Sequence, residues 1–277
     1  MSAPPAPDSP TPSPVNVDAL LARIQAASGL AFASFSVIHL SSWILLHSGS
    51  FDTADAALRV FRLYYQHPLV EPVVVGGSLL VHVGSSLARI ARRQTSAASR
   101  KSVTFEPAEE DIAQEPTATT SLSPVTLDKS YHRYAGWILA LQVPIHVTAT
   151  RINPLKILGA QASAKVIGAH FASFPTVVYP VGFRVYYALL ATSGLYHTVA
   201  GIGYALKTLR LLPPSTTDAA AAAVIAPSDE TSLRIRRWVL LGLGLSTVAA
   251  LSGVYYEVRF SEEQVRVFGV LNGAKTA

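Results

Sequence analysis

The sequence predicts an all-α membrane protein, a polytopic helical bundle of five transmembrane helices whose four-helix core is built from an internal repeat. Three observations support this prediction. Half of the 277 residues are hydrophobic and only 14% are charged, and such a composition favours a polytopic membrane protein over a soluble domain. Five apolar segments are long enough to cross a hydrocarbon core of about 30 Å as helices. Two of them share a pattern in which glycine precedes histidine by ten residues.

The five expected spans are separated by charged or polar segments. We expect a helix with Asp18 as its N-cap to lead into the first span, and Pro144 to kink the third span. The segment 166–182 is apolar but interrupted by prolines, so we expect an interfacial or re-entrant segment there, with a further span as the alternative. The expected spans are 26–50, 69–87, 134–150, 185–206 and 238–256.

Polar segments divide the chain into six parts. We expect a disordered proline-rich cytosolic tail, a first transmembrane repeat, a disordered polar loop, a second transmembrane repeat, a flexible linker, and a fifth transmembrane helix with a polar tail. In that order, these parts cover residues 1–17, 18–93, 94–128, 129–210, 211–233 and 234–277.

Charge and cysteine content exclude several classes of protein. Arginines cluster against span ends at 89–93 and 234–237, so we interpret the net charge of +5 as a topology signal with a cytosolic N-terminus and not as nucleic-acid binding. The chain has no cysteine, which excludes disulfides, thiolate metal sites, iron–sulfur clusters and covalently attached haem.

Each of the first four spans carries one deep histidine: His39, His82, His146 and His197. An ionisable side chain inside a membrane is a functional-site hypothesis, because an unpartnered one is costly. Spans one and three run in one direction and spans two and four in the other. The helical rise therefore places His39 with His146 at one level and His82 with His197 at a second level, on the order of 10 Å away.

Two bis-histidine pairs across a four-helix bundle would suit two b-type haems, with the four histidines as iron ligands. Gly29 and Gly136, ten residues before His39 and His146, lie on nearly the same helix face as those histidines and would make room for a flat macrocycle. The alternative is that the histidines only form hydrogen bonds between helices. His47, His67, His132 and His170 lie at span ends or in loops, and we expect them to be ordinary interfacial residues.

The segments Ser28-Gly29-x9-His39 and Tyr186-Tyr187…Tyr196-His197…Gly201 resemble the membrane-anchor cytochrome b subunits of succinate dehydrogenase and fumarate reductase. That fold implies two haems held by four histidines, but its histidine-free helix is the middle one and here it is the last. The duplicated unit, the fifth span and the polar N-terminus are more similar to a fungal family of mitochondrial outer-membrane adaptor proteins with a cytochrome-b-like transmembrane domain.

The resemblance to the adaptor family implies a multi-pass protein of the mitochondrial outer membrane, with a role in lipid homeostasis at organelle contact sites. It also implies recruitment of a bridge-like lipid-transfer protein through a Pro-x-Pro motif in the cytosolic tail, for which Pro10, Pro12 and Pro14 are the candidate residues. A proline-rich tail is a reasonable polyproline II ligand, and an inert tail is the alternative.

Three classes of function follow from the sequence. The first is a non-enzymatic adaptor that contacts membrane lipids and a lipid-transfer protein, with haem as a structural or sensing group. The second is a haem-b-containing membrane anchor or electron-transfer subunit of the succinate dehydrogenase type. The third is a stand-alone haem-dependent oxidoreductase. We expect the adaptor, with haem binding as the chemistry that the residues themselves best support.

Overall fold

The computed structural model describes residues 16–48, 50–103, 124–211, 229–255 and 257–273. These residues form helices and contain no strand, so the all-α prediction is confirmed for the described part of the chain. Most of the predicted N-terminal tail, polar loop and linker lies outside it. The elements are α1 Val17–Ile44, η1 Leu45–Ser48, α2 Phe51–Tyr65, η2 Glu71–Gly77, α3 Ser78–Val103, α4 Pro124–Val147, η3 Thr148–Ile152, α5 Asn153–Val166, α6 Ala169–Val178, α7 Pro180–Leu209, α9 Glu230–Leu251 and α10 Glu262–Leu271.

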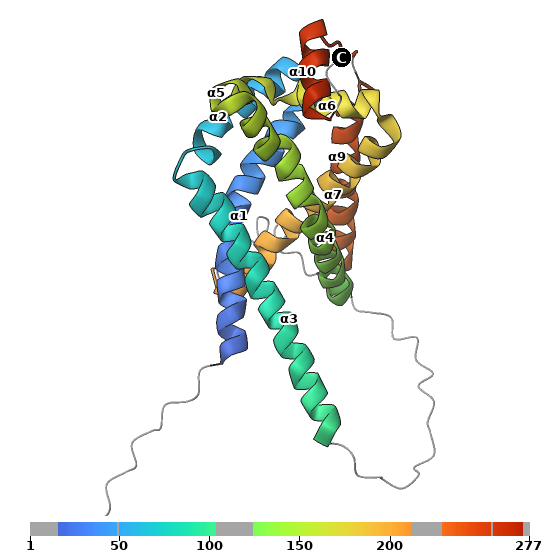
Figure 1. Cartoon of the computed structure of the whole chain (residues 1–277). Helices are drawn as coiled ribbons and strands as arrows, with labels where there is room; N and C mark the ends of the chain where they lie inside the picture. Colours follow the sequence, from blue (N-terminus) through green and yellow to red (C-terminus); the bar gives the residue numbers. More distant parts are fainter. Residues whose placement is uncertain (1–15, 49, 104–123, 212–228, 256, 274–277) are drawn as a thin grey trace, which may run out of the picture.

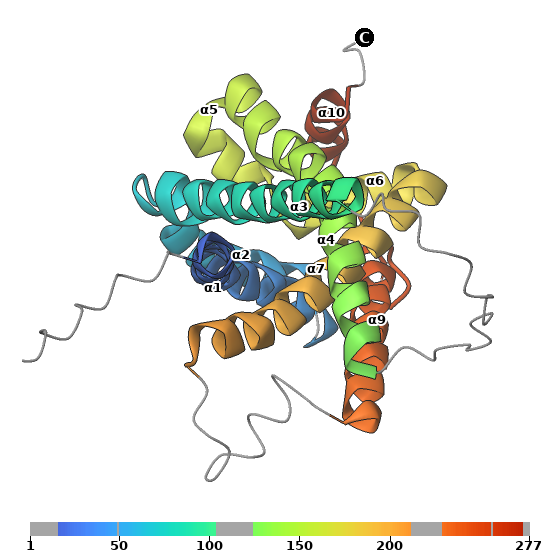
Figure 2. The same ribbon diagram turned by 90° about the horizontal axis from the view of Figure 1, so that it is seen from below.

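The long helices alternate in direction. Helices α1, α4 and α9 run toward the end of the molecule that carries α2, α5, α6 and α10, while α3 and α7 run away from it (Figure 1). Helix α1 packs against α3 and α7, and α7 also packs against α4 and α9. The view from below shows α1 with α3 on one side and α7 on the other (Figure 2).

Small side chains fill the helix contacts and large apolar ones face outward. The buried residues of α1 are all alanine or serine: Ala26, Ser28, Ala33, Ser36 and Ser42. In contrast, Leu80 and Leu141 are each 74% exposed. Because helices in lipid associate through small residues and leave their large apolar side chains outside, this distribution is typical of a membrane bundle.

Two helices of the described chain, Val17–His47 and Glu71–Ser96, are long and apolar enough to cross a membrane by length and composition. Tyrosine, serine, threonine and histidine residues lower the hydropathy of α7, and three arginines lie within the first two turns of α9. The structure thus supports a membrane protein with at least two candidate spans.

Two features differ from the sequence-based expectation: the N-cap of α1 and the environment of the segment 166–182. Asn16, and not Asp18, is the N-cap of α1, because its side chain accepts a hydrogen bond from the Ala19 N–H at 3.1 Å. The segment 166–182 contains α6, whose ten residues span about 15 Å as a helix. Helix α6 is therefore too short to cross a membrane, and its residues 171–176 are buried within the protein.

Helices α2 and α10 were not expected from the sequence. The range around Asp52, interpreted as a loop, forms α2, which is capped by Ser50 and buries Phe51 and Leu58. The polar C-terminal tail contains α10, which starts with a capping box and packs Phe268 against α6. Both helices are amphipathic and short, so each is stable only through its apolar face.

An ion pair joins the two π-helical segments, η2 and η3. Helix α4 continues through Pro144 to Val147 and is followed by the π-helical turn η3. Arg151 of η3 donates two hydrogen bonds to the carboxylate of Glu71 in η2, each at 2.5 Å. Glu71 lies inside the range expected for the second span, and this pairing neutralises it.

Candidate functional site

The structure brings the four deep histidines together as two pairs. The ring centres of His39 and His146 are 6.3 Å apart at an angle of 67°, and those of His82 and His197 are 6.2 Å apart at 84°. This is the pairing that helix direction and rise predict. The first pair (the upper pair) joins α1 to α4, and the second (the lower pair) joins α3 to α7, so both lie across diagonals of the four helices.

Backbone carbonyl groups orient the lower pair. His82 donates a hydrogen bond from Nδ1 to the Gln25 carbonyl at 2.9 Å, and His197 donates from Nδ1 to the His132 carbonyl at 3.0 Å. Since a carbonyl oxygen can only accept, both Nδ1 atoms carry the proton and each Nε2 keeps its lone pair. Among the described residues, neither Nε2 has a hydrogen-bond partner. This is the tautomer of a histidine that binds a metal through Nε2.

The two halves of the chain build the lower pair in the same way. Gln25 and His132, which supply the carbonyls, each lie four residues before a glycine, Gly29 in α1 and Gly136 in α4. A Cβ atom at Gly29 would lie 2.9 Å from His82 Nδ1, and one at Gly136 would lie 2.9 Å from His197 Cε1. Both glycines therefore make room for an imidazole of the lower pair, and the space predicted there for a macrocycle stays a prediction.

The upper pair has a different environment. The Trp43 indole donates a hydrogen bond to His39 Nε2 at 3.3 Å, and the Phe35 ring stacks on His39 with its centre 5.3 Å away. His39 Nδ1 is buried without a hydrogen-bond partner in the described part of the chain. Buried polar atoms are nearly always hydrogen-bonded, so this orphan nitrogen marks a place where a ligand could complete the site.

His132 belongs to the site although the sequence suggested an ordinary interfacial residue. Its ring stacks on His197 with the centres 4.1 Å apart and the planes at 9°, and it contacts Tyr204 edge-on. The available sequence signal was the repeat itself, since His132 and Gln25 occupy matching positions before Gly136 and Gly29.

The other three histidines that the sequence placed at span ends have partners elsewhere. His47 bonds Ser246 at 2.7 Å, His67 accepts from the Leu69 N–H, and His170 lies 3.2 Å from Asp55. None of these contacts involves a histidine of the two pairs.

A buried carboxylate anchors the helix that carries His132. Asp128 is only 1% exposed and accepts hydrogen bonds from the hydroxyls of Tyr196 and Tyr204 and from Arg236 at 2.6 Å. Burial acts to raise the pKa of Asp128, but the hydrogen bonds from the two tyrosines and Arg236 outweigh it, so the pKa lies below its ordinary value. The carboxylate thus holds α4, α7 and α9 together one turn before His132.

The spacing of both pairs fits a metal between the rings. A linear imidazole–metal–imidazole unit with metal–nitrogen bonds of about 2.0 Å separates the two ring centres by roughly 6.3 Å. Within the described ranges no three His, Cys, Asp or Glu side chains form a cluster that could hold a metal ion. Two histidines alone are sufficient for the iron of haem, because the porphyrin supplies the other four ligands.

No family model, curated protein or solved structure matches this chain. Pro10, Pro12 and Pro14, the candidate partner-binding residues, lie outside the described residues.

Proposed function

We propose that this chain is a five-span membrane protein whose four-helix core binds haem b between paired histidines. The observation that carries the proposal is the lower pair, His82 and His197. Both imidazoles have the protonated Nδ1 on a backbone carbonyl, a free Nε2, and a centre-to-centre separation of 6.2 Å. The two Nδ1 hydrogen bonds already connect neighbouring helices, and the Nε2 atoms, which have no partner among the described residues, remain available to a metal.

The helix directions support the five-span topology. The start of α1, the end of α3, the start of α4, the end of α7 and the start of α9 all lie at one end of the molecule (Figure 1). A chain that crosses the membrane five times has this arrangement. The small buried and large exposed side chains described above fit a lipid-facing surface on the same helices.

The two pairs differ in whether their Nε2 atoms are free to bind iron. In the lower pair both Nε2 atoms are free, whereas in the upper pair His39 Nε2 already accepts the Trp43 indole hydrogen bond. Iron binding at the upper pair must displace that hydrogen bond, so we expect the lower pair to bind haem more tightly. His82 contacts Gly29, ten residues before His39 on α1, which places the two levels about 15 Å apart along the helix.

For the biological role we propose a non-enzymatic adaptor of the mitochondrial outer membrane that acts in lipid homeostasis. Its support is the sequence resemblance together with the proline-rich segment at Pro10, Pro12 and Pro14. The paired histidines favour a second candidate, an electron-transfer membrane anchor, because bound haem would supply one-electron redox chemistry at two levels of the bundle.

Haem binding is tested by the reduced-minus-oxidised absorption spectrum of the full chain, purified in detergent after expression with haem supplied. We expect a b-type spectrum that loses the more tightly bound haem in His82→Ala and the weaker one in His39→Ala, while His67→Ala, a matched loop histidine, keeps both. A colourless protein, or equal loss in all three variants, would contradict the haem proposal.

A second experiment distinguishes the adaptor role from the electron-transfer role. An adaptor retains co-purification of a bridge-like lipid-transfer protein in His82→Ala and loses it when Pro10, Pro12 and Pro14 are all replaced by alanine. An electron-transfer subunit shows haem reduction by quinol in the wild type, and His82→Ala abolishes it. Co-purification that survives the triple proline variant would overturn the adaptor role of that segment.

A further inference from the structure

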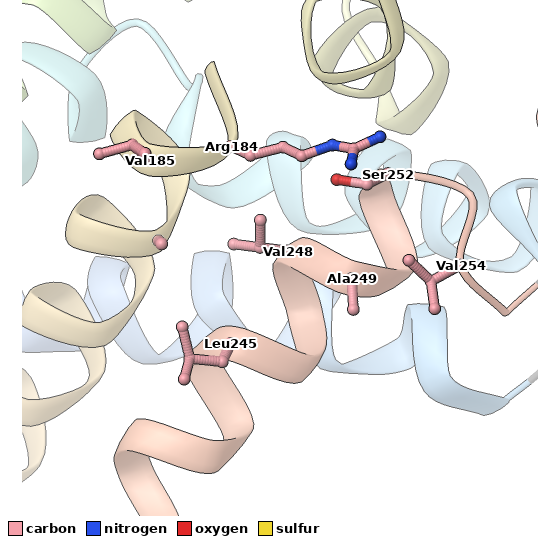
Figure 3. Close-up of a pocket in the computed structure, with 8 residues that line it drawn as sticks. Arg184, Val185, Leu245, Val248, Ala249, Ser252 and Val254 are labelled. Carbon is pink, nitrogen blue, oxygen red and sulfur yellow. The ribbon is translucent and has the colours of Figure 1, made fainter. Parts of the chain in front are cut away.

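An apolar groove runs along the outer surface between α7 and α9 (Figure 3). Its volume is about 330 Å³, at the lower end of the range for small-molecule sites in proteins. The groove is open on one side, so a ligand in it would also face the surrounding solvent or lipid. Its apolar lining consists of Val185, Ala188, Leu245, Val248, Ala249 and Val254.

One end of the groove carries two hydrogen-bond donors. Arg184 of α7 extends across this end toward Ser252, which follows α9 (Figure 3). The Arg184 Nε atom donates to the Thr176 carbonyl at 3.2 Å, which holds the guanidinium in place, and its two Nη atoms have no acceptor among the described residues. The Ser252 hydroxyl is buried and likewise lacks a partner within the described chain.

The charge at this end is unbalanced. The residues that line the groove include one cation, Arg184, and no carboxylate. A guanidinium next to a hydroxyl without a partner is suited to a phosphate oxygen, since arginine binds phosphate through charge-assisted hydrogen bonds. The groove therefore combines an anion-binding end with an apolar channel.

The polar end lies where a lipid headgroup would be. Arg184 is close to the start of α7, and Ser252 directly follows the end of α9. Tyr179 and Tyr255, at the same ends of these helices, are 50% and 53% exposed. Exposed tyrosines are typical of the membrane–water interface, so the apolar part of the groove extends from the interface into the hydrocarbon region.

We propose that this groove binds one anionic glycerophospholipid. One acyl chain lies along the apolar lining, and the headgroup phosphate accepts hydrogen bonds from Arg184 Nη and the Ser252 hydroxyl. Phosphatidylcholine, a zwitterionic lipid with no net charge, binds less tightly because its choline cation lies next to the same guanidinium. The inference rests on the proposed membrane bundle and is independent of haem binding.

The test is native mass spectrometry of the full chain released from phosphatidylcholine nanodiscs that contain a minor fraction of phosphatidylglycerol, an anionic lipid without a cation in its headgroup. We expect the wild type to retain one phosphatidylglycerol selectively, with an apparent preference of about tenfold or more. Arg184→Gln and Ser252→Ala should reduce the preference, and Ala249→Leu should reduce retention by filling the groove. Arg259→Gln is the matched control, since Arg259 is 82% exposed, outside the groove, and its loss changes net charge equally.

The outcomes separate the lipid site from the proposed function. Loss of selectivity in Arg184→Gln but not in Arg259→Gln supports the site. Equal retention of both lipids by the wild type, or equal loss in the two arginine variants, overturns it while the protein remains in the nanodisc. A chain that stays soluble without detergent overturns the membrane bundle and the lipid site together. Inorganic phosphate that competes as well as the lipid would show that the acyl chain contributes nothing, and would also overturn the proposal.

Discussion

Replacing Gly29 by alanine should disturb the lower histidine pair and leave the upper one intact. The added Cβ would lie 2.9 Å from His82 Nδ1 and 3.0 Å from its Cε1, whereas non-bonded carbon contacts are favourable at about 3.5–4.0 Å. The imidazole must therefore move away from α1 by roughly 0.6 Å. Because the Gln25 carbonyl is also on α1, the hydrogen bond of 2.9 Å lengthens to about 3.5 Å, beyond the normal range.

The expected stability change combines three contributions. Overpacking costs about 1–3 kcal/mol, and the weakened hydrogen bond costs about 0.5–1.5 kcal/mol. Alanine in a helix offsets about 1 kcal/mol of this. The matched control is Gly84→Ala on α3, two residues from His82, where a Cβ meets nothing within 4 Å, so only the gain in helix propensity remains. Because the propensity gain is common to both variants, we expect Gly29→Ala to be less stable than Gly84→Ala by roughly 3 kcal/mol, or about 6 °C in Tm.

Thermal unfolding of the full chain in detergent, followed by tryptophan fluorescence, measures the difference between the two alanine variants. The absorption spectrum of the same samples reports the haem content, which should fall in Gly29→Ala and in Gly136→Ala but not in Gly84→Ala. Equal unfolding temperatures and equal spectra for Gly29→Ala and Gly84→Ala would refute the proposed close packing of glycine on the lower histidines.

Two further predictions concern packing at the two ends of the bundle. Asp128→Asn should destabilise the protein by about 3–5 kcal/mol, because it leaves the Arg236 guanidinium buried without its carboxylate; Tm at neutral pH measures this loss. The folded pKa of Asp128 is lowered, so its stabilisation is present above the unfolded value of about 3.9 and is lost as the pH falls through the folded value. The Tm of the variant should therefore depend less steeply on pH in the acid range than the Tm of the wild type. Phe268→Ala should cost about 3–5 kcal/mol of local stability and speed hydrogen exchange in α10, and unchanged exchange there would contradict the packing of Phe268 on Phe171.

The pairing of the histidines could be predicted because only helix direction and rise determine it. A residue a fixed number of positions from the start of a span lies at a fixed depth, and alternating spans reverse that depth. The sequence could not assign Gly29 to His82, because that contact depends on how α1 and α3 are rotated about their own axes. For the same reason the role of His132 was missed, although it takes the position of Gln25 in the repeat.

The short amphipathic helices were missed for a different reason. Helix α10 has the start signal of Ser261 and Gln264, which form a capping box, followed by apolar residues at helical spacing, so its sequence does predict a helix. Helix α2 contains four charged residues in fifteen, and its apolar side chains acquire a partner only when η1 and α6 pack against it. The mean hydropathy of both helices is too low to indicate a membrane span, because each buries only one face within the protein.

A series of contacts connects each histidine of the lower pair to a carboxylate, and the side chains involved differ between the two halves of the molecule. In the first half of the molecule, Asp18 pairs with Arg89 at 3.6 Å, and Arg89 donates to the Gln25 side chain at 2.6 Å, while the Gln25 carbonyl accepts from His82. In the second half, Asp128 accepts from Tyr204, and Tyr204 packs on the ring of His132.

The Gln25 and His132 side chains therefore differ, but their carbonyls act in the same way on His82 and His197. Each of these hydrogen bonds also holds two helices together, α3 to α1 and α7 to α4. The repeated arrangement fixes the same nitrogen of both rings and leaves the other without a partner among the described residues. An axial metal ligand requires a ring that is held through one nitrogen and keeps the other nitrogen free, so the shared tautomer of the two rings favours haem more strongly than their proximity does.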